Sequence, residues 1–196
     1  MGWLYTKFPS WYESKDAYLR HQCRISEELK PQGYDNTVLK SAFVGTTWYA
    51  AVELKRPDAP TRVVAFVFLT RTSGGEFGYK DMDETVGPNE DRCPLSIMKL
   101  LTPVQESDGY AADWRERVYA YHAAQKAAKN LEEEMLGKVI AFDSPLQFGF
   151  GQVAGGKLER VAVGRARRQR LVIRANGFLC AVSKENLRTA KVVEAA

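Results

Sequence analysis

A polar stretch from Phe77 to Cys93 contains the densest group of chemically reactive side chains in the sequence. If the stretch begins as extended chain, Asp81 and Asp83 project to one face, and Lys80 and Glu84 project to the other. Two carboxylates at this spacing can hold Mg²⁺ through their oxygens, with water and phosphate completing the octahedron. Asp81 or Asp83 could then act as a general base, and Lys80 could neutralise a developing anion. These residue types fit a metal-dependent enzyme acting on a phosphate-containing substrate.

Two other interpretations of the stretch remain open. It can be a structural loop whose carboxylates cap the next helix and pair with Lys80 and Arg92. It can also be an acidic contact surface for a basic partner. Since no reaction is specified by the residue types, we expect a protein without catalytic activity and without a cofactor, and Mg²⁺ only if the enzyme interpretation holds. The acidic contact surface would comprise Asp81, Asp83, Glu84, Glu90 and Asp91.

Five arginines form a second group near the C-terminus. On a β-strand, Arg168, Arg170 and Arg174 share one face, whereas Leu171 and Ile173 point to the core. Such a row of guanidinium groups can bind phosphates or carboxylates through paired hydrogen bonds. The alternative is the solvated outer face of an antiparallel sheet. The candidate residues for binding an anion or a nucleic acid are Arg165, Arg167, Arg168, Arg170 and Arg174.

The cysteine and histidine content argues against a metal or disulfide framework. The three cysteines, Cys23, Cys93 and Cys180, are odd in number and far apart, which indicates a reducing, cytoplasmic environment. With only two histidines, the paired ligand spacing of a zinc site is missing. No apolar run approaches 18 residues and the N-terminus has no signal-peptide pattern, so we expect no association with a membrane.

The first part of the chain predicts helices around an antiparallel sheet. A helix is expected from Ser14 to about Leu29, followed by strands at Ala42–Leu54 and Thr61–Thr72 that form a hairpin over residues 42–72. Since Val63–Leu69 is apolar on both faces, this segment should be a central strand that is covered on both sides.

The remainder predicts two further features. Apolar residues at intervals of three and four indicate a long helix over residues 113–135, after a short helix beginning at Pro94. Five short strands then follow in fewer than 60 residues, which suggests a strongly bent sheet or an SH3-like barrel. They are expected at Lys138–Phe142, Lys157–Val163, Arg168–Ala175, Phe178–Ser183 and Leu187–Val193. The fold class is therefore α+β. We expect an α+β domain over residues 1–136, which includes an acidic loop at 77–93. A small all-β module over 137–196 follows, and it can share a core with the first domain.

Several short motifs resemble those of an uncharacterised protein family found on bacterial phages, plasmids and other mobile elements. They are Met1-Gly-Trp-Leu-Tyr-Thr, Phe77-Gly-Tyr-Lys-Asp-Met-Asp-Glu-Thr, Gly87-Pro88, Cys93-Pro94, Leu100-Leu-Thr-Pro103 and Trp114-Arg115. The resemblance covers the first two thirds of the chain and implies no activity. It implies a class of partner, since small accessory proteins of mobile elements often block host restriction or CRISPR complexes by binding alone.

The charge distribution supports a binding protein. A net charge of +4 conceals an acidic middle, with 7 basic and 13 acidic residues over 75–136, and a basic end, with 11 and 4 over 137–196. We therefore expect a non-catalytic, anti-defence binding protein with two contact surfaces, whose partner is a nucleic acid or a host defence nucleoprotein complex. The alternatives are the metal-dependent enzyme using Lys80, Asp81, Asp83 and Glu84, and a self-associating structural protein.

Overall fold

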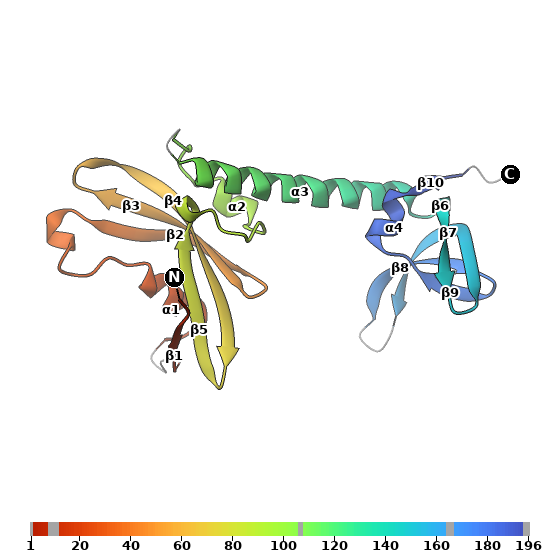
Figure 1. The fold of residues 1–196 in the computed structure, drawn as a ribbon, viewed down its shortest axis with the longest axis horizontal. Helices are drawn as coiled ribbons and strands as arrows, with labels where there is room; N and C mark the ends of the chain where they lie inside the picture. The colour runs from red at the N-terminus through yellow and green to blue at the C-terminus, as the bar shows by residue number, and fades with distance from the viewer. Residues whose placement is uncertain (1, 8–11, 106–107, 164–166, 194–196) are drawn as a thin grey trace. The chain divides into compact units, whose positions relative to one another are not determined.

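The computed structural model describes residues 2–7, 12–105, 108–163 and 167–193. The chain forms two compact units, residues 1–122 and 123–196, and helix α3 (Gly109–Met135) begins in the first and ends in the second (Figure 1). The boundary therefore falls inside the long helix and not at residue 136, because Leu131 and Met135 pack into the core of the second unit. Each unit combines an antiparallel five-stranded sheet with helices, which makes the fold α+β as expected.

The sheet of the first unit has the strand order β1-β5-β4-β3-β2, and all of its pairings are antiparallel. The predicted central strand is confirmed, because β4 lies between β3 and β5 and is covered on both faces. Ala65 and Val67 pack into a core with α2 and α3, whereas Phe68 packs with Trp48 in the core beside α1. The strands are β1 (Leu4–Thr6), β2 (Asp35–Val44), β3 (Thr47–Arg56), β4 (Ala59–Ser73) and β5 (Glu76–Asp83).

Two expected elements of the first unit need correction. The segment 42–54 is not one strand, since a turn at Gly45, whose φ is +62°, divides it between β2 and β3. Helix α1 (Lys15–Gln22) starts at the predicted cap, Ser14, but ends well before Leu29. The chain leaves the helix at Cys23, which is buried and whose carbonyl accepts a hydrogen bond from the Asn36 side chain.

The other helical segments of the first unit are short. They are a 3₁₀ turn η1 (Lys30–Gln32), a 3₁₀ turn η2 (Glu84–Val86) and helix α2 (Leu95–Met98). Pro94 is the N-terminal cap of α2 instead of its first residue. Ile97 and Met98 of α2 are buried against the sheet.

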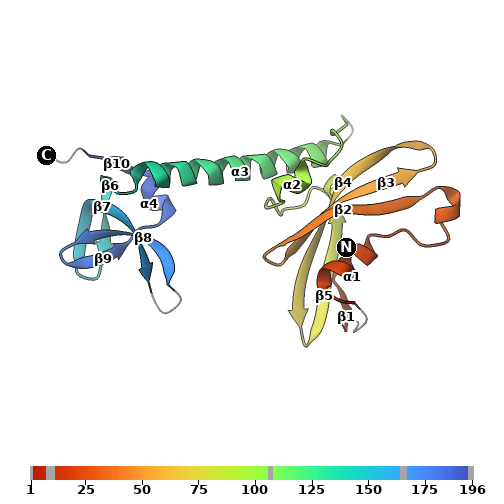
Figure 2. The same cartoon turned by 180° about the vertical axis from the view of Figure 1, so that it is seen from behind.

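The second unit is a five-stranded sheet of order β10-β6-β7-β8-β9. Strand β7 pairs with β6 through its first half and with β8 through its second half, so the sheet bends along β7 (Figure 2). Gly155 lies at this bend, where an added Cβ atom would come within 2.1 Å of the Ile140 carbonyl oxygen. The elements are β6 (Val139–Phe148), β7 (Gly151–Val163), β8 (Arg168–Ala175), β9 (Phe178–Ala181), α4 (Lys184–Arg188) and β10 (Ala190–Val192).

The last predicted strand, Leu187–Val193, is wrong in its first part. A capping box between Ser183 and Asn186 starts the one-turn helix α4, and the strand begins only at Ala190. Leu187 nevertheless points into the core, because the helical turn places its side chain there with 1% of its surface exposed.

Two further observations concern membrane-spanning helices and the cysteines. Within the part of the chain that the structure describes, no helix has the length and apolar character needed to cross a membrane. The three cysteines are free and buried. Burial raises the pKa of the Cys23 and Cys93 thiols to about 12, so both thiols stay protonated and unreactive at neutral pH.

Candidate functional site

The first part of the acidic stretch is a strand and not a loop. Residues 76–83 form β5, which pairs with β4 on one side and with β1 on the other. The alternation of faces is as expected: Tyr79 packs into the core beside α1, and Met82 packs against the core beside α2 and α3. The ring of Tyr5 in β1 covers Gly78, where a Cβ atom would lie 2.8 Å from the ring. The first two of the motifs that carry the family resemblance thus lie in neighbouring strands.

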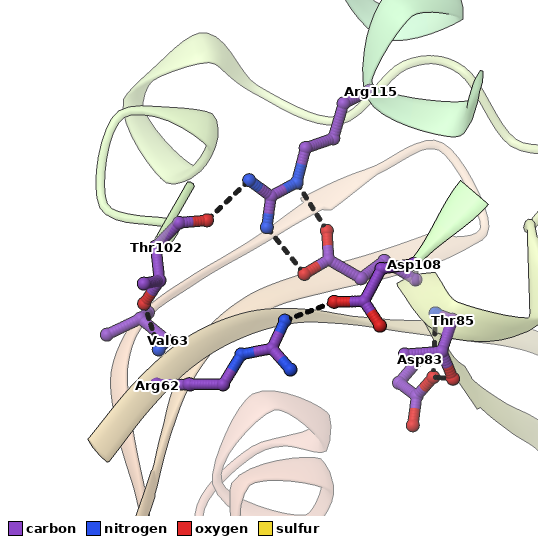
Figure 3. A network of polar contacts seen from close by, with 8 residues as sticks. Arg62, Val63, Asp83, Thr85, Thr102, Asp108 and Arg115 are labelled. Atoms are coloured by element: carbon purple, nitrogen blue, oxygen red, sulfur yellow. Dashed lines mark hydrogen bonds and ion pairs between the residues drawn. The ribbon is translucent and has the colours of Figure 1, made fainter. Parts of the chain in front are cut away.

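Glu84 is a buried partner of Arg115 (Figure 3). Arg115 donates from Nε to Glu84 Oε2 at 2.7 Å and from Nη2 to Oε1 at 2.6 Å, and its Nη1 donates to the Thr102 carbonyl at 2.6 Å. The Glu84 side chain is only 1% exposed. Both of its oxygens are occupied by one guanidinium group, so Glu84 does not form part of a contact surface.

Asp83 and Asp91 also have structural partners. Asp83 caps η2 by accepting hydrogen bonds from the Thr85 amide at 2.9 Å and from the Thr85 hydroxyl at 2.5 Å. Asp91 forms an ion pair with Arg117 of α3 at 3.1 Å. The structural-loop interpretation therefore accounts for these two carboxylates, although their partners are Thr85 and Arg117 and not Lys80 and Arg92.

The loop after β5 is fastened to α3 at several points. Trp114 donates from Nε1 to the Glu90 carbonyl at 3.1 Å, and Arg117 donates to the Pro88 carbonyl at 2.5 Å. Together with the ion pairs of Glu84 and Asp91, these bonds tie residues 84–91 to α3. Side chains of α3 thereby fix the position of the acidic stretch.

The members of the proposed acidic contact surface differ in their exposure. Glu84 is buried, whereas Asp81, Asp83, Glu90 and Asp91 are each partly exposed, and Lys80 is half-buried as well. Within the described ranges, no three His, Cys, Asp or Glu side chains gather into a group that could hold a metal ion. The candidates for a metal-dependent site are therefore present in sequence but do not converge.

A second part of the network in Figure 3 holds the chain before α3. Arg62 of β4 forms an ion pair with Asp108, and the Val63 amide donates to the Thr102 hydroxyl at 2.6 Å. Sequence reasoning missed Arg62, Thr102, Asp108 and Arg115. Their partners lie 13 to 46 residues away along the chain, so no local pattern could have shown these contacts.

A cavity of about 460 Å³ lies beside β5 in the first unit. Leu69, Met82, Val86 and Pro88 give it apolar walls, and Lys80 is a cation in its lining. Lys80 therefore lines this cavity, whereas Glu84 and Asp83 do not.

The arginines of the second unit differ in their availability. Arg168 and Arg170 on β8 are exposed, and so is Arg167, which has a φ of +45° in the turn before the strand. None of the three has an ion-pair partner among the residues described. Arg174 differs, because its Nε lies 3.0 Å from Glu159 on β7. Arg165 lies outside the described residues.

The alternation predicted for β8 is correct at its core face. Leu171 and Ile173 pack into the core, as expected. Val172, which falls on the arginine face, is also buried, with 2% of its surface exposed. The available positive charge therefore comes from Arg167, Arg168 and Arg170, which we call the basic surface.

A cavity of about 680 Å³ adjoins the basic surface. Arg160, Arg170 and Lys184 line it, together with Glu132 of α3. Glu132 is 8% exposed. It forms ion pairs with Arg160 at 2.5 Å and with Lys184 at 3.6 Å. Two cations thus pair with one carboxylate and Arg170 adds a third positive charge to the lining, which leaves an excess of positive charge that favours an anion.

A family model matches part of this chain. Residues 105–185 match the model of a domain of unknown function (DUF6927). The matched region contains α3 and most of the second unit, including the described arginines of β8. No curated protein and no solved structure has significant similarity to this chain.

Proposed function

We propose that this protein is a non-catalytic binding protein that engages a nucleic acid or a nucleoprotein complex through its basic surface. The observation that supports this function is the exposure of Arg167, Arg168 and Arg170 without ion-pair partners among the described residues. A guanidinium group that is not neutralised by its own protein can form paired hydrogen bonds with phosphate oxygens.

The charge of the surrounding chain supports the same function. Residues 137–196 contain 11 basic and 4 acidic side chains. Two of the acidic residues, Asp143 and Glu159, are each paired with one cation, Lys191 and Arg174 respectively. A polyanion approaching this unit therefore meets an excess of positive charge, which increases the rate of association and the affinity at low salt.

The acidic stretch has a supporting role in this proposal. The carboxylates of Glu84 and Asp91 anchor the loop after β5 to α3, so the proposal does not rely on them for binding a partner. The metal-dependent enzyme is the less supported alternative, because Asp83 and Glu84 are already bonded within the protein. If Asp81→Asn together with Asp83→Asn abolished an Mg²⁺-dependent reaction, that alternative would replace our proposal.

The biological context that we propose follows from the resemblance to proteins of phages and plasmids. A small basic binding protein of a mobile element could occupy the nucleic acid that a host defence complex must reach, or bind the nucleoprotein complex itself. Both modes are of the anti-defence type, and neither requires catalysis.

The experiment is a titration of nucleic acid with the full chain at several salt concentrations, followed by fluorescence anisotropy. The affinity should fall steeply with salt, and replacing Arg167, Arg168 and Arg170 together by Ala should reduce the slope of log K against log salt by about 2 to 3, from about 0.7 to 0.9 per phosphate contact. The matched control replaces three exposed lysines elsewhere, Lys40, Lys99 and Lys126, and should leave the slope nearly unchanged. Equal binding by the arginine variant and the control would refute the proposal.

A further inference from the structure

Three phenylalanine rings form a continuous stack at one end of the second unit. The ring centroids of Phe148 and Phe150 are 5.7 Å apart with an interplanar angle of 9°. Those of Phe150 and Phe178 are 4.6 Å apart with an angle of 18°. We call these three rings the phenylalanine stack.

The stack runs from the core to the surface. Phe148 packs against the hydrophobic core of the unit. Phe150 is 38% exposed and Phe178 is 54% exposed, so the outer rings are in contact with water. Two adjoining exposed rings are costly in water, and such patches on soluble proteins commonly mark contact sites.

The local sequence fixes the rings on two hairpin turns. Phe148, Gly149 and Phe150 lie where β6 turns into β7. Phe178 follows Asn176 and Gly177, whose φ angles of +51° and +81° are those of a tight type I′ turn. The turn sets the backbone from which Phe178 projects, and its ring lies against that of Phe150 on the other hairpin.

The phenylalanine stack lies at one end of the edge strand β9. The cavity lined by Arg160, Arg170 and Lys184, which we call the cationic cavity, lies at the other end. Phe178 is the first residue of β9, and Ala181, its last residue, lines the cavity with Arg160, Arg170 and Lys184. At about 3.3 Å per residue, the two ends of β9 are separated by about 10 Å. A flexible polyanion with planar rings could reach both features at the same time.

We infer that the ligand is a single-stranded nucleic acid, with an unpaired base stacked on Phe178 and the backbone phosphates at Arg170 and the cationic cavity. This inference rests on the proposed function and names its ligand class. Aromatic side chains combined with a positively charged groove are the general means by which proteins hold single strands. In a duplex the base faces are covered by neighbouring bases, so no base would be free to stack on Phe178.

The alternative occupants of the stack are a second copy of the chain and an apolar peptide. Neither would account for the cations at the other end of β9. The charge of the adjoining cavity therefore favours a ligand that carries both aromatic rings and phosphates.

The test compares three probes by fluorescence anisotropy with the full-length protein: a 15-nucleotide oligothymidylate, a duplex of the same length, and inorganic polyphosphate, which has no bases. Phe178→Ala should weaken binding of the oligothymidylate about 5- to 150-fold, which corresponds to the loss of one stacked base. It should leave binding of polyphosphate within about twofold. Phe178→Tyr should retain binding because it keeps the ring, and Tyr119→Ala, which removes an exposed ring from α3, should have no effect.

Each alternative result has a defined meaning. Equal affinity of Phe178→Ala and the wild type for the oligothymidylate would overturn the inference, and so would an equal loss for polyphosphate. A shift from dimer to monomer on sedimentation of Phe178→Ala, with unchanged oligothymidylate binding, would identify the stack as a self-association surface. If none of the three probes bound in a salt-dependent manner, the proposed function itself would fail.

Discussion

The buried pair of Glu84 and Arg115 gives a quantitative test of how the acidic stretch is held. Arg115→Met would leave the Glu84 carboxylate, now 1% exposed, without its guanidinium partner. Removing one partner of a buried ion pair costs about 3 to 5 kcal/mol, because the remaining charge stays out of water. The variant should therefore lose about this much free energy of unfolding.

The same reasoning predicts that a second substitution restores stability. Replacing Glu84 by Leu in the Arg115→Met variant removes the uncompensated charge, and an apolar pair at such a site is often as stable as the ion pair. The double variant should recover most of the loss. This recovery separates the effect of a buried charge from a loss of packing at Arg115.

The chain offers a matched control and a convenient signal. Glu27 and Lys30 are also 2.6 Å apart, but their side chains are 84% and 41% exposed, so Glu27→Gln should cost no more than about 1 kcal/mol. All four tryptophans, at positions 3, 11, 48 and 114, belong to the first unit, so tryptophan fluorescence during urea unfolding reports on that unit. A loss below 1 kcal/mol in Arg115→Met, or a double variant as unstable as the sum of the single ones, would refute the reasoning.

Two further predictions concern the bend of β7 and the response to acid. Gly155→Ala should destabilise the second unit by about 3 kcal/mol or more, because the new Cβ meets backbone atoms of β6. Gly149→Ala is the control, because its new Cβ has open space. Hydrogen exchange of the β6 and β7 amides measures the stability of both variants. Burial would raise the pKa of Asp16, but hydrogen bonds from Ser41, Trp48 and Arg20 outweigh it and hold that pKa below its ordinary value of 3.8. The stability that Asp16 contributes is thus complete above about pH 4 and lost as the pH falls through the lowered pKa. Asp16→Asn should flatten the acid limb of the stability profile, and an unchanged limb would contradict this.

The local patterns in the sequence predicted the elements that depend on near neighbours. The apolar run Val63–Leu69 indicated a strand that is covered on both faces, and β4 is that strand. The repeat of apolar residues over 113–135 indicated the long helix, because side chains three and four residues apart share one face of a helix. The alternation on β8 placed Leu171 and Ile173 in the core for the corresponding reason.

Errors arose where a single residue changed the backbone direction. Gly45 divides a segment that propensity alone would make one strand, and the capping box at Ser183 replaces the start of a predicted strand by a helical turn. Both outcomes depend on one or two side chains against a background of strand-forming residues. The domain boundary was misplaced for a different reason, since the end of α3 packs with strands that follow it.

The sequence by itself determined the types of residues at the candidate sites and the fold class that carries them. Only the tertiary structure decided which charges are available. Glu84 meets an arginine 31 residues away and is buried, while Arg174 meets Glu159 across two strands and Arg170 meets no carboxylate among the described residues. The phenylalanine stack likewise joins two hairpin turns that are far apart in sequence. Charge pairing and ring stacking act through space, whereas the patterns that can be read in a sequence report only on neighbours along the chain.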